Sequence, residues 1–383
     1  MWVAARAMRW TPVSLHRRGA VQTNHARHLC APKRAAAQPR PKLPPPTPKE
    51  AAIILGRPIY SDEHVLAINK QSGLLSQPDA SGLPTAHEAA DALHKGSSFS
   101  PIHRLDKLAT GCLILCKTRL ASKGLGIAFA EQFVVKNYLA VVSGRRLRQG
   151  ATSQFTTLMS TNVRGRIFVS EQHADLSWVK PVKQRETTLR YRTLATYGDT
   201  ALVVASICGG YKHQIRAMLA YHGLPILGDP VYGGERWHGE EPFLALHAAT
   251  MQVAHPIEEH APLRLLAPIP SATWLHYMPA PLVTAAEEAV RDAERAAAAA
   301  AAQDAQGNAA GTATHLPSHP SNPSLPALLP GPLWEGQPVA RPSRPPAFER
   351  QEEQHAHDHE SETRRHRTRR RRRRSIQPGA EAA

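Results

Sequence analysis

A string of residues with the chemical types of a reactive site, H-R-L-D-K-L-A-T-G, begins at His103. Its carboxylate, Asp106, stands between two cations, Arg104 and Lys107. The glycine of the string leads into an apolar run at residues 112–116, and a short run of this kind is typical of a buried strand. The pattern therefore predicts a carboxylate beside cations at the edge of a core.

The string resembles the signature of the RluA-type pseudouridine synthases, in which an H-R-L-D core carries a single catalytic aspartate. Three further segments resemble other motifs of that family, in the family's order: Asp62–Leu74, Lys136–Gly144 and Gly210–Tyr232. The family's closing L-H-A and H-P elements follow at 246–248 and 255–256. One position departs from the family, because Tyr211 stands where Arg is common, but the resulting G-x-K-H-Q-I-R form resembles organellar eukaryotic members, and we expect this chain to be one. The resemblance covers about residues 52 to 270, the size of one catalytic domain.

Hydrophobic patterning predicts several strands and few helices. We expect strands at 65–68, 111–116, 138–142, 187–194 and 201–207, and helices at 86–94, 117–132 and 213–221. Elements that do not alternate strictly favour an α+β fold. The resemblance implies a pseudouridine synthase fold, with a central, mainly antiparallel mixed sheet, flanking helices and an active-site cleft. Residues 144–186 match the family only loosely, so substrate contacts there are not carried over.

The resemblance implies that Asp106 acts on the ribose of a uridine, either by attack at the anomeric carbon or by removal of the 2′ proton. An ionised carboxylate in a dry pocket needs a cation nearby. Arg216 is the candidate, because a guanidinium pairs bidentately with a carboxylate and stays charged. By resemblance Tyr138 stacks on the flipped uracil and helps to take the carbon 5 proton; the alternative is an ordinary strand tyrosine.

The basic residues of the motifs are candidates for RNA contacts. Arg104 either enters the helix that the base leaves or holds a phosphate, although a surface ion pair is a competing interpretation. Phosphate contacts are expected from Lys107, Lys136 and Lys212. Four other motif residues are expected to fix loops and orient Asp106: His103, Gln214, Asp229 and His247.

The charge of the chain is unevenly distributed. The net charge is +16 over 383 residues, yet residues 1–49 hold ten Lys/Arg and no acid, and residues 364–374 hold nine Arg. Residues 51–280 hold 23 Lys/Arg and 17 Asp/Glu, and this moderately basic segment suits RNA, a polyanion that is bound locally through phosphates. No apolar run reaches the roughly 18 residues of a membrane span, so we expect no membrane association. A monomer is expected.

The two ends of the chain lie outside the resemblance. Residues 1–49 have the Arg-rich, acid-free composition of a mitochondrial targeting segment, followed by a Pro-rich linker; a basic RNA-binding arm is the alternative. The catalytic domain is expected at 52–280. Residues 281–383 are expected to hold a solvent-exposed helix at 285–303, then a disordered tail with the Arg-rich run 364–374. That run favours RNA binding or nuclear import, an alternative location.

Cofactors are not expected, because the isomerisation changes no oxidation state and transfers no group to or from another molecule. The cysteines include no C-x-x-C pair, and Cys112 and Cys116 are expected to be buried, reduced thiols without a metal. Two alternatives to an RNA pseudouridine synthase of ribosomal or transfer RNA remain. One is a catalytically weak RNA-binding factor in organellar ribosome assembly. The other is a glycosidase, which needs a second carboxylate opposite the first, and the sequence shows none near Asp106.

Overall fold

The computed structural model describes residues 43–309, apart from 80, 95–98, 145, 163–166, 171–180, 235–241 and 258–261. Within this part, eleven strands form one sheet in the order β1-β2-β4-β10-β5-β9-β8-β6-β7, with β3 paired to β4 and β11 paired to β10. Among the described strands the only parallel pairing joins β4 to β10. The expected α+β fold with a mainly antiparallel mixed sheet is confirmed.

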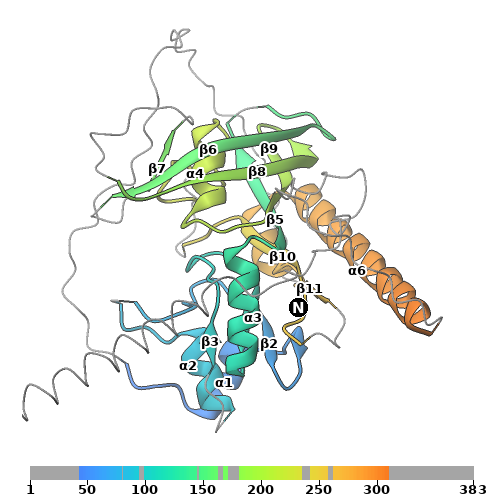
Figure 1. Ribbon diagram of the computed structural model, residues 1–383. Helices are drawn as coiled ribbons and strands as arrows, with labels where there is room; N and C mark the ends of the chain where they lie inside the picture. Colours follow the sequence, from blue (N-terminus) through green and yellow to red (C-terminus); the bar gives the residue numbers. More distant parts are fainter. Residues whose placement is uncertain are drawn as a thin grey trace, which may run out of the picture.

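The elements of the sheet and its helices are spread over the whole described chain (Figure 1). The strands are β1 Tyr60–Ser61, β2 Val65–Lys70, β3 Ser100–Pro101, β4 Thr110–Cys116, β5 Val134–Ser143, β6 Thr152–Asn162, β7 Ile167–Ser170, β8 Pro181–Tyr197, β9 Thr200–Ile207, β10 Leu246–Val253 and β11 Leu263–Leu266. The helices are α1 Pro48–Leu55, α2 Ala86–Leu93, α3 Arg119–Ala130, α4 Gln214–Tyr221, α5 Ser271–Tyr277 and α6 Ala280–Ala309.

Strands β2 and β4 are apolar at nearly every position because both of their faces are buried. Alternate residues of each strand enter two separate hydrophobic clusters: Leu66 and Leu113 belong to one, and Ala67 and Ile114 to the other. This explains the continuous apolar runs in the sequence. The expected strands are all confirmed, although β5 and β8 extend beyond the ranges that the pattern predicted.

Gly111 fixes the place where β4 meets β10. Its φ of 110° favours glycine, and a Cβ atom there would lie 2.2 Å from the carbonyl oxygen of Ala248 on β10. Because any side chain would force these strands apart, the T-G step that follows Asp106 anchors the aspartate's loop to the centre of the sheet.

The first correction concerns the start of the domain. The extended Pro-rich linker was expected to run to residue 49, but helix α1 begins at Pro48. Thr47 caps it through a reciprocal capping box with Glu50, and Pro48 occupies the first turn, where its missing N–H costs nothing. Helix α1 packs against α2, so it belongs to the folded domain.

The second correction concerns α6. The helix expected at 285–303 is present but begins earlier and is not solvent-exposed throughout. Leu282, Val283 and Ala286 are fully or almost fully buried, and Val290 is 7% exposed. This first part of α6 contacts β8, β9 and β11, while the helix then extends away from the sheet (Figure 1). The domain that was expected to end at residue 280 therefore includes the first turns of α6.

The third difference is the pair of strands β6 and β7, which lie in the segment that matched the family only loosely. Strand β6 pairs with β8 over most of its length and extends the sheet at the far side from β2.

No helix of the described residues is long and apolar enough to cross a membrane. Residues 1–42 of the expected targeting segment and linker, and the Arg-rich run 364–374, lie outside the described residues.

Candidate active site

Asp106 lies in the loop between β3 and β4 and lines a cavity of about 550 Å³. The cavity walls also come from α3, from β5, from the turn between β9 and α4, and from α4 itself. Most of the predicted site residues line it: Arg104, Asp106, Lys136, Tyr138, Lys212 and Arg216. Lys107 is exposed and is not among the lining residues. Motifs separated by more than a hundred residues therefore meet at one cavity.

The predicted pairing of Arg216 with Asp106 is present. Arg216 lies on α4, where its Nη1 donates to Asp106 Oδ2 at 2.8 Å. The side chains are 6% and 18% exposed, so this ion pair is largely removed from water. Arg216 also makes a bidentate contact with Asp229, through Nε at 2.7 Å and Nη2 at 2.9 Å. One guanidinium therefore bridges two carboxylates.

The charges around Asp106 keep it ionised. Burial alone would raise the pKa of Asp106, but the neighbouring His213, Arg216 and Arg104 lower it, and the result lies below the ordinary value. Burial lowers the pKa of His213 to about 4, so this imidazole is neutral at pH 7. Arg216 is therefore the principal charge that holds Asp106 as a carboxylate. Burial also acts against the charge of Arg216, but its bonds with the two aspartates raise its pKa.

His213 is a site residue to which sequence reasoning gave no role. Its Nε2 lies 3.7 Å from Asp106 Oδ1, and its Nδ1 lies 3.0 Å from the hydroxyl of Tyr232. The residue caps α4 with a left-handed backbone, at φ 57° and ψ 21°. Its place in the H-Q-I-R motif was a usable signal, but the unusual backbone that turns the ring toward Asp106 is not visible in the sequence.

Tyr138 lies on β5 and lines the cavity at 7% exposure. Burial raises the pKa of its hydroxyl, and the negative charge of Asp106 raises it further. The hydroxyl therefore stays protonated at neutral pH. This position and protonation state suit an aromatic surface for a base and a group that passes a proton on, rather than a resident base.

Lys70 is a second residue that sequence reasoning did not assign. It is fully buried at the end of β2, and its Nζ donates to the carbonyl oxygens of Gln71 at 2.9 Å, Leu74 at 2.8 Å and Lys107 at 3.1 Å. Burial lowers the pKa of Lys70 to about 7, although the charge of Asp106 opposes this. The three acceptors match the three donors of an ammonium group. Lys70 thereby ties the loop that carries Asp106 to the core.

Lys136 differs from its expected role as an exposed phosphate contact. It is 4% exposed on β5, and its ammonium lies over the ring of Phe129 at 5.4 Å. Burial lowers its pKa to about 8, while nearby Cys208 opposes the shift. Lys136 therefore forms part of the cavity wall. Arg104 and Lys212 line the cavity with exposed side chains, as a phosphate contact requires.

The residues expected to act as scaffold do so. His103 accepts from the backbone of Ile114 at 2.9 Å, and burial lowers its pKa to about 3. Gln214 accepts from the Tyr211 backbone and donates to the Thr188 carbonyl. His247 is fully buried between Thr110 at 2.8 Å and the Ala267 carbonyl at 3.0 Å. These contacts fix the segments on either side of the cavity.

Asp229 is a second carboxylate that shares Arg216 with Asp106. Its Oδ1 accepts from the backbones of Val231 and Tyr232, and both oxygens contact Arg216. Asp229 is 1% exposed and is not among the residues that line the cavity. A glycosidase needs its second carboxylate on the opposite side of the bond that breaks, facing the substrate. Asp229 therefore orients Arg216 and does not meet that requirement.

The burial of Cys112 and Cys116 agrees with the sequence expectation. Cys112 and Cys116 are buried, free thiols, and burial raises the pKa of both to about 12. In the described part of the chain, no group of three or more His, Cys, Asp or Glu side chains is arranged to hold a metal ion.

Comparison with known proteins decides the family. Residues 64–221 match the family model described as RNA pseudouridylate synthase. The matched domain belongs to the RluA-type RNA pseudouridine synthases. Its residues include Asp106, Tyr138 and Arg216, which meet at the cavity.

Two curated relatives of this pseudouridine synthase domain are bacterial proteins. The chain is 29% identical to the ribosomal large subunit pseudouridine synthase D of Zymomonas mobilis, over 56% of this chain and 70% of that protein. It is 34% identical to the ribosomal large subunit pseudouridine synthase C of Vibrio cholerae, over 54% of this chain and 65% of that protein. The chain thus spans about two thirds of the length of these relatives.

A solved structure is similar as well. Human RNA Pseudouridylate Synthase Domain Containing 4 matches at a TM-score of 0.46 and 22% identity, covering 60% of this chain and 94% of that one.

Proposed function

We propose that this protein isomerises uridine to pseudouridine in ribosomal or transfer RNA of mitochondria, with Asp106 as its catalytic carboxylate. The observation that carries the proposal is the ion pair between Asp106 and Arg216, 2.8 Å apart, at a cavity lined also by Tyr138. A carboxylate held ionised at the wall of a cavity is the group that the reaction needs at the ribose. The family membership of residues 64–221 supports the same reaction.

The reaction breaks the bond between the anomeric carbon and nitrogen 1 of uracil and forms a bond from that carbon to carbon 5. Asp106 either attacks the anomeric carbon, forming an ester bond that breaks when carbon 5 bonds to that carbon, or removes the 2′ proton and returns it at that same step. Both routes require the ionised form of Asp106. After the base has rotated and rejoined, carbon 5 loses its proton and nitrogen 1 gains one, so that atoms balance without a co-reactant. Tyr138 lies beside Asp106 in the cavity, where it stacks on the detached base and relays the carbon 5 proton.

The base must leave its stack before it reaches Asp106, because the cavity encloses the carboxylate. Arg104 and Lys212 are exposed at this cavity, where they suit the phosphates on either side of the flipped nucleotide. A binding factor without catalysis gains nothing from a desolvated, ionised aspartate, which costs free energy to bury. The Asp106–Arg216 pair therefore favours the enzyme over the RNA-binding factor.

Pseudouridine mapping tests the reaction and its target together. RNA from whole cells and from purified mitochondria is sequenced for pseudouridine in cells with the protein, without it, and with Asp106→Asn in its place. We expect specific mitochondrial sites to disappear without the protein and to return only with the wild-type chain. Unchanged sites in every RNA class would contradict the proposed activity, while loss of sites only outside mitochondria would contradict the location.

The location rests on the composition of residues 1–49, and it has its own test. A fluorescent reporter fused behind residues 1–49 is expected to enter mitochondria. The matched control replaces the five arginines of residues 1–27 with glutamine, which should leave the reporter in the cytosol. A nuclear reporter with the segment 360–383 alone would support the alternative location.

A further inference from the structure

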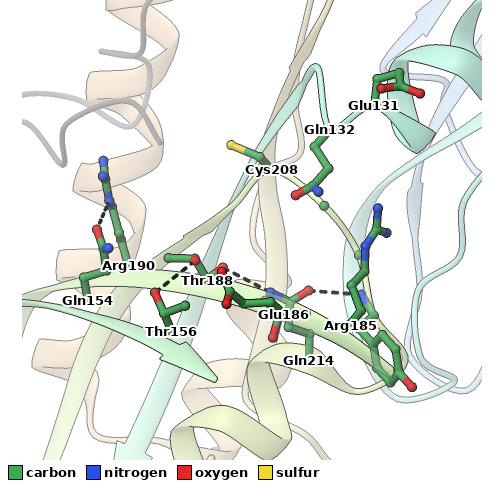
Figure 2. A pocket seen from close by; sticks show the side chains of 14 residues that line it. Glu131, Gln132, Gln154, Thr156, Arg185, Glu186, Thr188, Arg190, Cys208 and Gln214 are labelled. Atoms are coloured by element: carbon green, nitrogen blue, oxygen red, sulfur yellow. Dashed lines mark hydrogen bonds between the residues drawn. The ribbon is translucent and has the colours of Figure 1, made fainter. Parts of the chain in front are cut away.

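A second cavity, of about 490 Å³, adjoins the catalytic one. Its floor is formed by β6 and β8, and its walls come from the turn between α3 and β5 and the turn between β9 and α4 (Figure 2). Gly210, Tyr211 and Gln214 line both cavities. The two cavities therefore share a wall at the turn between β9 and α4 and the first residue of α4.

The lining of the second cavity is polar and balanced in charge. The lining residues, all of them in the described part of the chain, include no aliphatic side chain, but they include two arginines, two glutamates and three glutamines. Arginine only donates hydrogen bonds and ionised glutamate only accepts them. An apolar ligand would find no partner surface here, and a phosphate would meet two carboxylates. The cavity suits a neutral, polar ligand that offers both donors and acceptors.

Several of these groups are held in place before any ligand binds. Arg190 Nε donates to Gln154 Oε1 at 2.6 Å across the β6–β8 pair, and the hydroxyls of Thr156 and Thr188 lie 3.1 Å apart beside them. Figure 2 shows Gln132 reaching in from the opposite wall, between Arg190 and Arg185. Gln132 directly follows the C-cap of α3, and its φ of 63° is the left-handed conformation that commonly ends a helix.

We propose that this cavity binds an unstacked guanine next to the target uridine, and that it sets the sequence context of the reaction. Guanine presents two acceptors, O6 and N7, that match a bidentate arginine, and two donors, N1–H and the N2 amino group, that match a carboxylate. Arg190 and Arg185 supply the first kind of partner, and Glu131 and Glu186 the second. Adenine has no two adjacent acceptors that an arginine guanidinium could contact with two of its N–H groups. The inference rests on the proposed isomerisation and adds its specificity.

The test uses a pool of RNA hairpins whose loop holds one uridine with randomised nucleotides on both sides. The full chain acts on the pool, and the pseudouridine-containing molecules are sequenced. We expect guanine at one flanking position to be favoured over adenine by about 5- to 150-fold, the range for one bidentate arginine–guanine pair. Arg190→Gln and Arg190→Lys should both bring this ratio close to one, because lysine keeps the charge but lacks the fork.

Arg146→Gln is the matched control, since it removes the same charge from an exposed arginine that pairs with Asp199 outside both cavities. This variant should keep the guanine-to-adenine ratio of the wild type. Equal rates for all flanking bases in the wild type would overturn the proposal. So would an Arg190→Gln variant that is slower on every sequence by the same factor, because that result indicates a contact to the RNA backbone.

A binding measurement separates this proposal from the proposed reaction. The same pool is selected for affinity to the Asp106→Asn chain, which keeps the second cavity intact. If no RNA is converted but guanine is still enriched among the bound molecules, the reaction fails and the guanine site stands. If RNA is converted without any preference in either experiment, the reaction stands and the guanine site fails. No conversion and no enrichment would overturn both.

Discussion

The two neighbouring cavities handle charge in different ways. At the catalytic cavity, the pair Asp106–Arg216 is largely buried, and a fully buried Lys70 lies behind it. At the second cavity, the charged side chains of Glu131, Arg185 and Arg190 are exposed or half-buried. Both cavities share the turn between β9 and α4, so they are close neighbours. The burial of their charged side chains differs because the catalytic cavity lies deeper in the fold.

This difference separates the requirements of catalysis from those of recognition. A buried charge interacts strongly with its partner but depends on it, since removal of one partner leaves the other unpaired in a poorly solvated place. A half-exposed charge is still solvated by water when its partner is removed, so removal of the partner costs little stability. Substitutions should therefore affect folding and turnover at the first cavity and mainly selectivity at the second.

The largest effect is expected from Asp106→Asn. The amide keeps the shape of the side chain but is neither a nucleophile nor a base, so isomerisation should fall to the background rate while RNA affinity stays within about twofold. Release of tritium from carbon 5 of labelled uridine in RNA measures the rate. Asp199→Asn, an exposed aspartate paired with Arg146, is the control and should keep normal turnover. Substantial turnover by purified Asp106→Asn would remove the central assignment.

Arg216→Leu should come next, because it leaves both Asp106 and Asp229 without their buried partner. A loss of about 3–5 kcal/mol in the free energy of unfolding is typical for such a change, and denaturant unfolding measures it. Arg216→Lys keeps the charge without the fork and is the variant to assay if the leucine variant does not fold. Full stability and turnover in both variants would show that Arg216 is not the counter-ion.

The pH profile of Arg216→Lys also tests whether Arg216 keeps Asp106 ionised. Arg216 helps to hold the pKa of Asp106 below its ordinary value, so wild-type activity is retained as the pH falls and is lost only on passing through that lowered pKa. A weaker partner lets the pKa of Asp106 rise, since burial then dominates. The acid limb of the rate profile should therefore move to higher pH in Arg216→Lys. An unmoved limb would mean that another group keeps Asp106 ionised.

Lys70→Met should have an intermediate effect. It removes the donor that binds the carbonyl oxygens of Gln71, Leu74 and Lys107, and buried acceptors without a donor cost about 1–3 kcal/mol of stability. Because the Asp106 loop loses its tie to the core, turnover should fall more than RNA affinity. Lys123→Met, at an exposed position of α3, is the control. Equal stability of the two variants would show that the Lys70 bonds are dispensable.

The smallest effects are expected at the exposed cations. Arg104→Gln and Lys212→Gln should each weaken RNA binding without a change in stability, and each should lower the slope of log affinity against log salt by about 0.7. Lys136→Gln should behave differently, because its ammonium is buried over Phe129, and should lower stability with little change in slope. Unchanged stability together with a lower slope would indicate that Lys136 contacts a phosphate.

The sequence predicted the residues around Asp106 well, because each element there has a strong local pattern. The runs of β2 and β4 are apolar on both faces, and the aspartate and its arginine belong to recognisable motifs. Burial was harder to predict. Lys136 and Lys70 look like ordinary lysines, and only the packing of β5 and β2 between neighbouring strands removes them from water.

Regions without such patterns were predicted poorly. Strand β6 is rich in threonine and serine and shows no apolar run, so its place in the sheet depends on pairing with β8. The second cavity, which stands on these strands, had no sequence signal at all. The burial of the first part of α6 was missed for a related reason, since Glu287, Glu288 and Glu294 lie among its buried residues and suggested an exposed helix.

Strand β10 sets a lower limit on the piece of this chain that folds by itself. It occupies the centre of the sheet, with β4 on one side and β5 on the other, yet at residues 246–253 it lies beyond the segment 64–221 that matches the family. A recombinant fragment cut to that segment would have two unpaired strand edges at its middle and is expected to aggregate. A fragment that reaches Ala293, the last buried side chain among those described in α6, also keeps Leu282 and Val283 out of water. The end of the family-model match and the end of a fragment that keeps its sheet and core intact are therefore different places in this polypeptide.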